Sequence, residues 1–271
     1  MRKTGKTDLS AARKRYLQQQ NRYIGRVKLC RVALLVGFFV LWEVAASFGW
    51  IDPFIFSQPS RIAETVVSMW QQGLLGHILV TVGETLAGFL LGAVIGCALA
   101  VLLWFSPFLS RVSEPYLVVL NSLPKIALGP VIIVVAGAGV KAIVLMALAI
   151  SLIVTVLEMQ GGFGRTDAEL IRMARTFGAS RVQIFRYIVF PFNIPTLFAS
   201  LKVNIGLSLV GVIAGEFLVS GEGLGYLIVY GGQVFRLDLV MSGVLILTVV
   251  AALMYEGVVL LQRLVMRHYR Y

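Results

Sequence analysis

Polar, ionisable and helix-kinking residues interrupt the apolar stretches of this sequence at a few positions. An ionisable side chain is costly to hold in hydrocarbon, so within such a stretch it marks the interior of a helix bundle or a solute pathway. The function that such residues could serve is therefore to contact a solute as it passes. Glu43, Glu84 and Glu256 are as consistent with pairing between helices, or with a place near an interface, as with solute contact. Our candidates for lining a pathway are Asn121, Pro124, Lys125, Lys202, Ser208 and Glu216.

Bond-breaking chemistry has little support. Gly206, Leu207 and Ser208 are similar to the nucleophile motif of an intramembrane serine protease. Neither His77 nor His268 is placed to act as the base that such a serine needs. The stretch GKT at residues 5–7 lacks the earlier glycine and the preceding strand of a phosphate-binding loop. We therefore expect no catalytic residue in this chain.

Metal and redox chemistry are not indicated either. Two histidines with no cysteine or carboxylate at ligand spacing do not predict a metal centre. Cys30 and Cys97 do not form a CxxC pair and lie in or beside apolar stretches, which is typical of core residues. We expect this chain to bind no cofactor and no metal.

The composition predicts an integral membrane protein. Hydrophobic residues make up 58% of the 271 residues and charged residues 14%, and the mean hydropathy is +0.87. Soluble domains have about 45–50% apolar and about 25% charged residues. A net charge of +11 would suit a nucleic-acid partner, but the basic residues cluster at the ends of apolar stretches. Because this placement is a topology signal, we expect no nucleic-acid partner.

Six apolar runs are long enough to span a bilayer, which takes roughly 20 residues of helix. Residues 1–31 precede them and carry ten lysines and arginines against one aspartate. We expect this basic segment to be cytoplasmic and the first run to be a retained anchor, because a cleavage site of small residues does not follow it. Residues 32–271 then form one six-span domain. The runs cover residues 32–50, 82–105, 113–137, 141–160, 195–217 and 239–262.

The charges between the runs favour cytoplasmic N- and C-termini, since lysine and arginine concentrate on the cytoplasmic side. The expected location is the plasma membrane of a prokaryote. In the second run, Gly88, Gly92 and Gly96 share a helix face and allow close helix packing. In the third run, Pro124 and Pro130 predict a kinked or broken helix, either for packing or for lining a pathway.

One basic amphipathic stretch stands apart from these runs: RTDAELIRMARTFGASRVQIFRYIVFPFNIP, residues 165–195, with five arginines. Helical spacing places Leu170, Ala174 and Phe177 on one face. Gly178 then predicts a helix end, and Ser180 the cap of a second helix. The stretch thus predicts a helix, a bend and a helix. Its apolar face needs a partner surface, and the pattern suits anionic lipid as well as a protein.

This stretch resembles the cytoplasmic Glu-Ala-Ala signature of permease subunits of ATP-binding-cassette importers. The signature is Glu-Ala-Ala, three residues, Gly, nine residues, Ile, one residue, Leu and Pro. Ala174, Gly178, Ile188 and Pro191 match it in register. Arg172 replaces the usual Glu, and Phe190 replaces Leu, so a salt bridge from the usual Glu is not carried over. Glu169, one turn earlier, could supply a carboxylate from a shifted position.

The resemblance covers most of the chain. The segments FSQPSRIAETVVSMW, NSLPKIALGPVIIV, RTFGASRVQIFRYIVFPFNIP and VIAGEFLVSGEGLGYLIVYG are similar to the nitrate, sulfonate and taurine branch of these permeases. The resemblance implies an all-α, six-span type I importer permease fold with a cytoplasmic coupling loop at about residues 162–191. The residues expected to couple to an ATPase are Glu169, Arg172, Ala174, Arg175, Phe177, Gly178, Ala179, Ile188 and Pro191.

The same resemblance implies a set of partners. Two ATPase subunits would bind ATP and Mg²⁺, a second permease copy would complete the pathway, and an external solute-binding protein would deliver a small solute. Sulfonate-, taurine- or nitrate-like anions are preferred. The rival hypothesis is a secondary transporter or channel that works without an ATPase, with Lys125, Lys202 and Glu216 serving coupling ions or a pore.

Two further segments lie between the expected spans. GEGLGYLIVYGG, residues 221–232, is too short for a span and is either a re-entrant piece at the outer gate or an ordinary loop. QPSRIAETVVSMWQQ, residues 58–72, has a helix start at Pro59 and Ser60. Apolar residues follow at helical spacing, so we expect an amphipathic helix lying on the external membrane surface.

Overall fold

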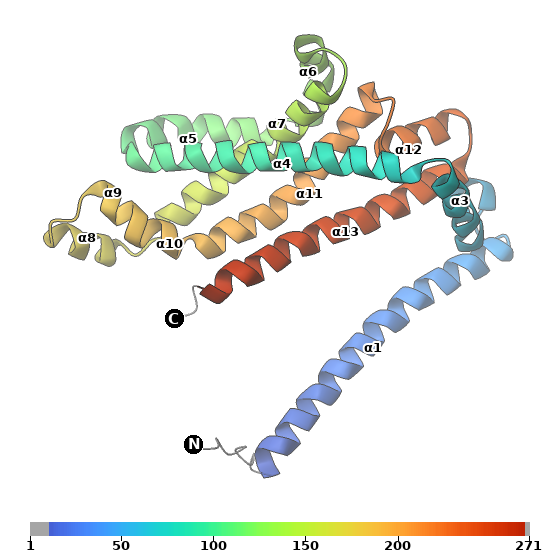
Figure 1. The fold of residues 1–271 in the computed structure, drawn as a ribbon, viewed down its shortest axis with the longest axis horizontal. Coiled ribbons are helices and arrows are strands. Elements are labelled where there is room, and N and C mark those ends of the chain that lie inside the picture. Colours follow the sequence, from blue (N-terminus) through green and yellow to red (C-terminus); the bar gives the residue numbers. More distant parts are fainter. Residues whose placement is uncertain (1–10, 269–271) are drawn as a thin grey trace, which may run out of the picture. The chain divides into compact units, whose positions relative to one another are not determined.

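The chain folds entirely into helices and connecting turns in the computed structural model, which describes residues 11–268 and contains no strand within that range (Figure 1). The longer helices are α1 (Ala11–Ser47), α3 (Pro59–Gln71), α4 (Leu74–Phe105), α5 (Pro107–Ser122), α7 (Val140–Gly164), α11 (Ile194–Val219) and α13 (Leu237–His268). The shorter ones are α2 (Pro53–Phe56), the 3-10 helix η1 (Lys125–Leu128), α6 (Gly129–Ala136), α8 (Ala168–Thr176), α9 (Arg181–Ile184), the π-helix η2 (Phe185–Val189), α10 (Phe190–Phe192) and α12 (Leu224–Gln233).

Five of these helices are long and apolar enough to cross a membrane: Arg22–Ser47 within α1, α4, α7, α11, and Leu237–Arg267 within α13. The third expected span, 113–137, is instead a pair of helical segments, Pro107–Ser122 and Lys125–Ala136, bent by 86°. The break falls at Leu123 and Pro124, where proline cannot continue the preceding helix. Counting the bent pair as one span gives six, so the described chain has the helices of an all-α multi-pass membrane protein.

The described chain divides into two compact units, with the division between Glu64 and Thr65. In the first unit, Glu43 of α1 accepts hydrogen bonds from the Ser60 backbone N–H (3.0 Å) and hydroxyl (2.9 Å) at the start of α3. Glu43 thereby caps a helix N-terminus. The expected boundary between a basic segment and the spans, at residue 31, falls inside the continuous helix α1, and residues 1–10 lie outside the described range.

The second unit is built on three helices, α4, α7 and α11, which pack against one another along their lengths. The three spaced glycines of α4 make this packing possible. A Cβ on Gly88 would lie 2.5 Å from the Cβ of Ala147, and one on Gly96 would lie 2.7 Å from the Cβ of Thr155. Gly92 likewise faces Ser151. Small residues at such contacts let helix backbones approach closely in lipid.

Two apolar clusters lie at opposite ends of this three-helix core. One joins α3, α4, α12 and α13 through Met69, Leu74, Leu224 and Leu239. The other joins α4 and α7 to the segment after α7. The helix expected at residues 58–72 is present as α3, and the segment at 221–232 contains α12, the helix that precedes α13.

Candidate functional site

The loop between α7 and α11 is a folded unit with capped helix ends. Asp167 caps α8 by accepting the Glu169 N–H at 2.7 Å, and Gly178 ends it with a left-handed φ of +81°. Ser180 then caps α9 in a reciprocal capping box with Gln183. The helix, bend and helix expected from the sequence are therefore present, with the second helix continuing through η2 and α10 into α11.

One side of this loop packs onto the helix ends of the bundle. Ile171, Ala174 and Ala179 lie against a buried cluster that includes Phe163 and Ile184. Phe185 contacts Trp104 and Phe163, with ring centroids 5.0 Å and 5.4 Å away. The Arg181 guanidinium donates to the Phe105 carbonyl oxygen at the end of α4 (3.3 Å). These contacts hold α9 and η2 on the ends of α4 and α7, and α8 joins the same buried cluster through Ile171 and Ala174.

The other side of α8 presents apolar side chains to the surroundings. Leu170, Met173 and Phe177, at spacing i, i+3 and i+7, are exposed, and Phe177 is 82% exposed. We call these three residues the α8 ridge. Ala174 does not belong to it, contrary to the face expected from the sequence, because Ala174 turns toward the buried cluster. Met173 takes its place.

Charged residues flank the α8 ridge. Glu169 and Arg172 form an i, i+3 ion pair at 3.8 Å, and their side chains are 85% and 71% exposed. An ion pair this exposed contributes little to stability, so both groups remain accessible for other contacts. Arg175 is exposed as well, and Ile188 and Pro191 are half-buried where η2 meets α10.

Asn193 and Thr166 close the loop, although their sequence pattern does not single them out. Asn193 is 2% exposed, and its side-chain amide donates to the Thr166 hydroxyl (2.9 Å) and to the Val189 carbonyl oxygen (2.9 Å). The first bond links the beginning of the loop to its end. The only sequence signal was a polar residue between Pro191 and Pro195, which is equally typical of an ordinary turn.

The candidate pathway residues fall into three separate places. Asn121, Pro124 and Lys125 form the bend after α5, where the Lys125 ammonium donates to the Asn121 carbonyl oxygen (2.9 Å). Lys202 is half-buried on α11. Ser208 and Glu216 are 0% and 1% exposed on the face of α11 that packs into the bundle.

An apolar groove of 820 Å³ runs between the bend and helices α11 and α13. Its lining includes Ile126 and Pro130 after the bend, Ile213 and Phe217 of α11, and Val244 of α13. Lys125, Ser208 and Glu216 are each adjacent in sequence to a lining residue, but none of the three lines the groove. Among residues 11–268 there is also no cluster of side chains suited to hold a metal ion.

Residues 88–271 match the family described as the inner membrane component of binding-protein-dependent transport systems. The chain belongs to this family. The match takes in the bend, the loop with the α8 ridge, α12 and α13. The family is one of transporter permeases, which is consistent with a chain that is not itself an enzyme.

Curated relatives of this permease span nearly its whole length. A probable ABC transporter permease of Haemophilus influenzae is 27% identical over 86% of this chain and 95% of its own length. The riboflavin transport permease RibX of Chloroflexus aurantiacus is 30% identical over 84% and 85%. The putative aliphatic sulfonates permease SsuC of Bacillus subtilis is 28% identical over 95% and 92%.

A solved structure has the same fold. A chain of the MetNI methionine ABC transporter, in an inward-facing conformation, matches with a TM-score of 0.63 over 73% of this permease and 96% of that chain, at 21% identity. The importer-permease fold expected from the sequence is thereby confirmed.

Proposed function

We propose that this permease is the membrane subunit of an ATP-driven importer, and that the α8 ridge is its attachment site for a separate ATPase subunit. Each of two ATPase subunits would bind ATP and Mg²⁺ and engage one α8 ridge, on this chain and on a second permease copy. An external solute-binding protein would deliver the solute. On this proposal the loop at 162–191 and both chain termini are cytoplasmic.

The α8 ridge is the observation that carries the proposal. Three exposed apolar side chains stand on a helix whose opposite side belongs to the buried cluster that also takes in residues of α4 and α7. A surface fixed in this way can transmit force, because a partner that moves it must also move the helices beneath it. Gly178, Ile188 and Pro191 stand where the importer signature has its glycine, isoleucine and proline, which supports a protein partner over lipid.

The solute is a small molecule, and we prefer a sulfonate-, taurine- or nitrate-like anion. Relatives named for these solutes include SsuC, the taurine permease TauC of Escherichia coli and the nitrate permease NrtB of Synechocystis. RibX and the formylaminopyrimidine permease ThiX of Halalkalibacterium halodurans are named for uncharged or heterocyclic solutes. Lys125 and Lys202 are the cationic candidates for contact with an anion.

Reconstitution into liposomes tests the energy source. The permease with its ATPase and binding protein should take up solute only when ATP and Mg²⁺ are enclosed on the ATPase side. The permease alone should move no solute along a proton or sodium gradient. Uptake by the permease alone would overturn the proposal in favour of a secondary transporter or channel.

A further inference from the structure

The N-terminus of α12 is held by side chains from two other helices. Three successive backbone N–H groups of residues 223–225 each find a side-chain acceptor. Gly223 donates to the His77 Nδ1 atom (3.0 Å), Leu224 to the Thr81 hydroxyl oxygen (2.8 Å) and Gly225 to a Glu216 carboxylate oxygen (2.5 Å). The first N–H groups of a helix have no partner within the helix, so α4 and α11 together supply what α12 lacks.

Glu216 and Thr81 form the centre of this arrangement. The Thr81 hydroxyl donates to the second Glu216 oxygen (2.7 Å) while it accepts the Leu224 N–H, so the hydroxyl bridges the carboxylate and the helix end. Both residues are essentially unexposed, at 1% and 0%. A buried carboxylate is costly unless it is hydrogen-bonded, and the positive end of a helix dipole favours it further.

Two glycines of the GEGLG stretch, Gly223 and Gly225, are a steric requirement of this contact. Gly223 has a φ of +104°, which favours glycine, and a Cβ on Gly225 would stand 2.7 Å from the Glu216 Oε2 atom. A Cβ on Gly221, by contrast, would meet nothing within 4 Å. Residues 221–225 are therefore built to bring the α12 backbone against a carboxylate, which neither an ordinary loop nor a pathway-lining role for Glu216 explains.

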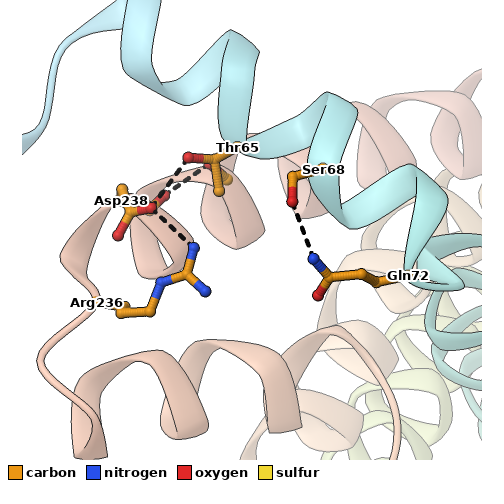
Figure 2. A network of polar contacts seen from close by, with 6 residues as sticks. Thr65, Ser68, Gln72, Arg236 and Asp238 are labelled. Atoms are coloured by element: carbon orange, nitrogen blue, oxygen red, sulfur yellow. Dashed lines mark hydrogen bonds and ion pairs between the residues drawn. The ribbon is translucent and has the colours of Figure 1, made fainter.

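The opposite end of α12 is attached as well. The Arg236 N–H donates to the Gly231 carbonyl oxygen (2.8 Å), turning the chain into α13. Figure 2 shows the next contact: the Asp238 carboxylate accepts the Thr65 hydroxyl of α3 (3.0 Å) and pairs with Arg236 (3.3 Å). Leu224, unexposed, packs with Met69 of α3. The N-terminal end of α12 is thus held by α4 and α11 and lies in a cluster with α3, while its C-terminal end turns into α13, which is itself bonded to α3.

Helix α11 connects this arrangement to the coupling loop. It runs without interruption from Ile194 to Val219, a length of about 39 Å at 1.5 Å per residue, and Glu216 lies one turn before its end. A displacement of the loop at the beginning of α11 therefore reaches Glu216 through a continuous helix. The hydrogen bonds at residues 223–225 then transmit this displacement from α11 to α12.

We propose that Glu216 is a positioning residue for transport: with Thr81 it latches α12 to α4 and α11, so that movement of α11 moves the α12 side of the permease. The inference rests on the proposed function, because the movement originates at the α8 ridge. Glu216 acts through α12 and does not touch the solute.

Amide hydrogen exchange in the reconstituted complex tests the latch directly. Thr81→Val removes the bridging hydroxyl, and exchange of the amides at 223–226 should accelerate at least about tenfold. Thr85→Val is the matched control, since Thr85 is equally buried one turn away on α4 but its hydroxyl donates to its own helix, at the Thr81 carbonyl oxygen (2.7 Å). Thr81→Ser keeps the hydroxyl and should restore protection.

A second pair of variants makes the same comparison from the side of α12. Gly225→Ala places a methyl group against the carboxylate and should accelerate exchange, whereas Gly221→Ala should leave it unchanged. If the Thr81→Val variant cannot be expressed, Gly225→Ala and Gly221→Ala serve as the test in its place. Glu216→Gln, which keeps the shape but loses the charge, should show an intermediate acceleration.

The functional readout is the number of ATP molecules hydrolysed per solute imported. Thr81→Val and Gly225→Ala should raise this number severalfold while the ATPase still co-purifies, because the α8 ridge is intact. Amide exchange at 223–226 that is unchanged in both variants, or that accelerates equally in their controls, would overturn the latch. So would faster exchange with an unchanged number of ATP molecules hydrolysed per solute imported. Failure of ATP-driven uptake in the unmodified complex would instead overturn the proposed function and leave the exchange result standing by itself.

Discussion

Gly211 of α11 lies directly against the backbone of Ala147 in α7: a Cβ on Gly211 would stand 2.6 Å from the Ala147 Cα atom. Gly88 of α4 faces the side chain of the same alanine. One small residue is therefore enclosed by glycines from two other helices, and the spacing of the three-helix core is set at this level. Any added atom must push two helices apart.

Gly211→Ala should destabilise the permease by roughly 1–3 kcal/mol, the usual cost of forcing an extra group into a packed core. Thermal unfolding in detergent measures the change. Gly206→Ala is the control on the same helix, because a Cβ there would meet nothing within 4 Å. The control should be neutral or slightly stabilising, since alanine favours helix more than glycine does. Equal effects of both changes would contradict the packing described.

Phe177→Asp should weaken ATPase binding to the permease by about thirtyfold, the effect of losing an aromatic anchor that contributes about 2 kcal/mol to an interface. Permease stability should not change, because Phe177 is 82% exposed. Co-purification and titration of the ATPase against detergent-solubilised permease measure the affinity. Tyr187→Asp, at a 69% exposed aromatic residue of η2 outside the α8 ridge, should have a much smaller effect.

Gly178→Val should reduce both uptake and ATPase attachment through the backbone alone. A Cβ at Gly178 would meet nothing within 4 Å, but φ is +81°, a conformation that costs a branched residue roughly 1–3 kcal/mol. Gly178→Asn is the informative comparison, because asparagine tolerates the left-handed region and should retain most activity. If valine and asparagine are equally harmful, the side chain itself disturbs the docking surface and backbone strain is not the cause.

Most of the fold could be predicted from composition and span length, since a bilayer demands about 20 apolar residues for each helix. The prolines of the third run also predicted a kinked or broken helix at Pro124, but they did not predict its 86° angle. The face of α8 was predicted in part. Spacing alone grouped Ala174 with Phe177, and only the position of the loop on α4 and α7 turned Ala174 inward.

Side-chain partners distant in the sequence could not be predicted. Glu216 was recognisable as an expensive ionisable residue, with bundle interior and pathway left open. Its hydrogen bond to Thr81 joins residues 135 positions apart, and that pairing depends on how α4 packs against α11. The glycines at 223 and 225 are plain in the sequence. Only the fold shows why they are needed, because it brings the Glu216 carboxylate against them.

Asn193→Leu should destabilise the loop between α7 and α11 without touching the α8 ridge. Asn193 is nearly isosteric with leucine but donates to Thr166 and to the Val189 carbonyl oxygen, and Thr166 is 5% exposed. Its removal leaves buried polar groups without their donor, at a cost of about 1–3 kcal/mol.

The expected result is a lower unfolding temperature and faster amide exchange at residues 165–193, with weaker ATPase attachment as a consequence. The double change Thr166→Val with Asn193→Leu should recover part of the loss, because replacing both partners removes the stranded hydroxyl. A double variant no more stable than Asn193→Leu alone would show that the bond between the beginning and the end of the loop is not what holds α8 in place.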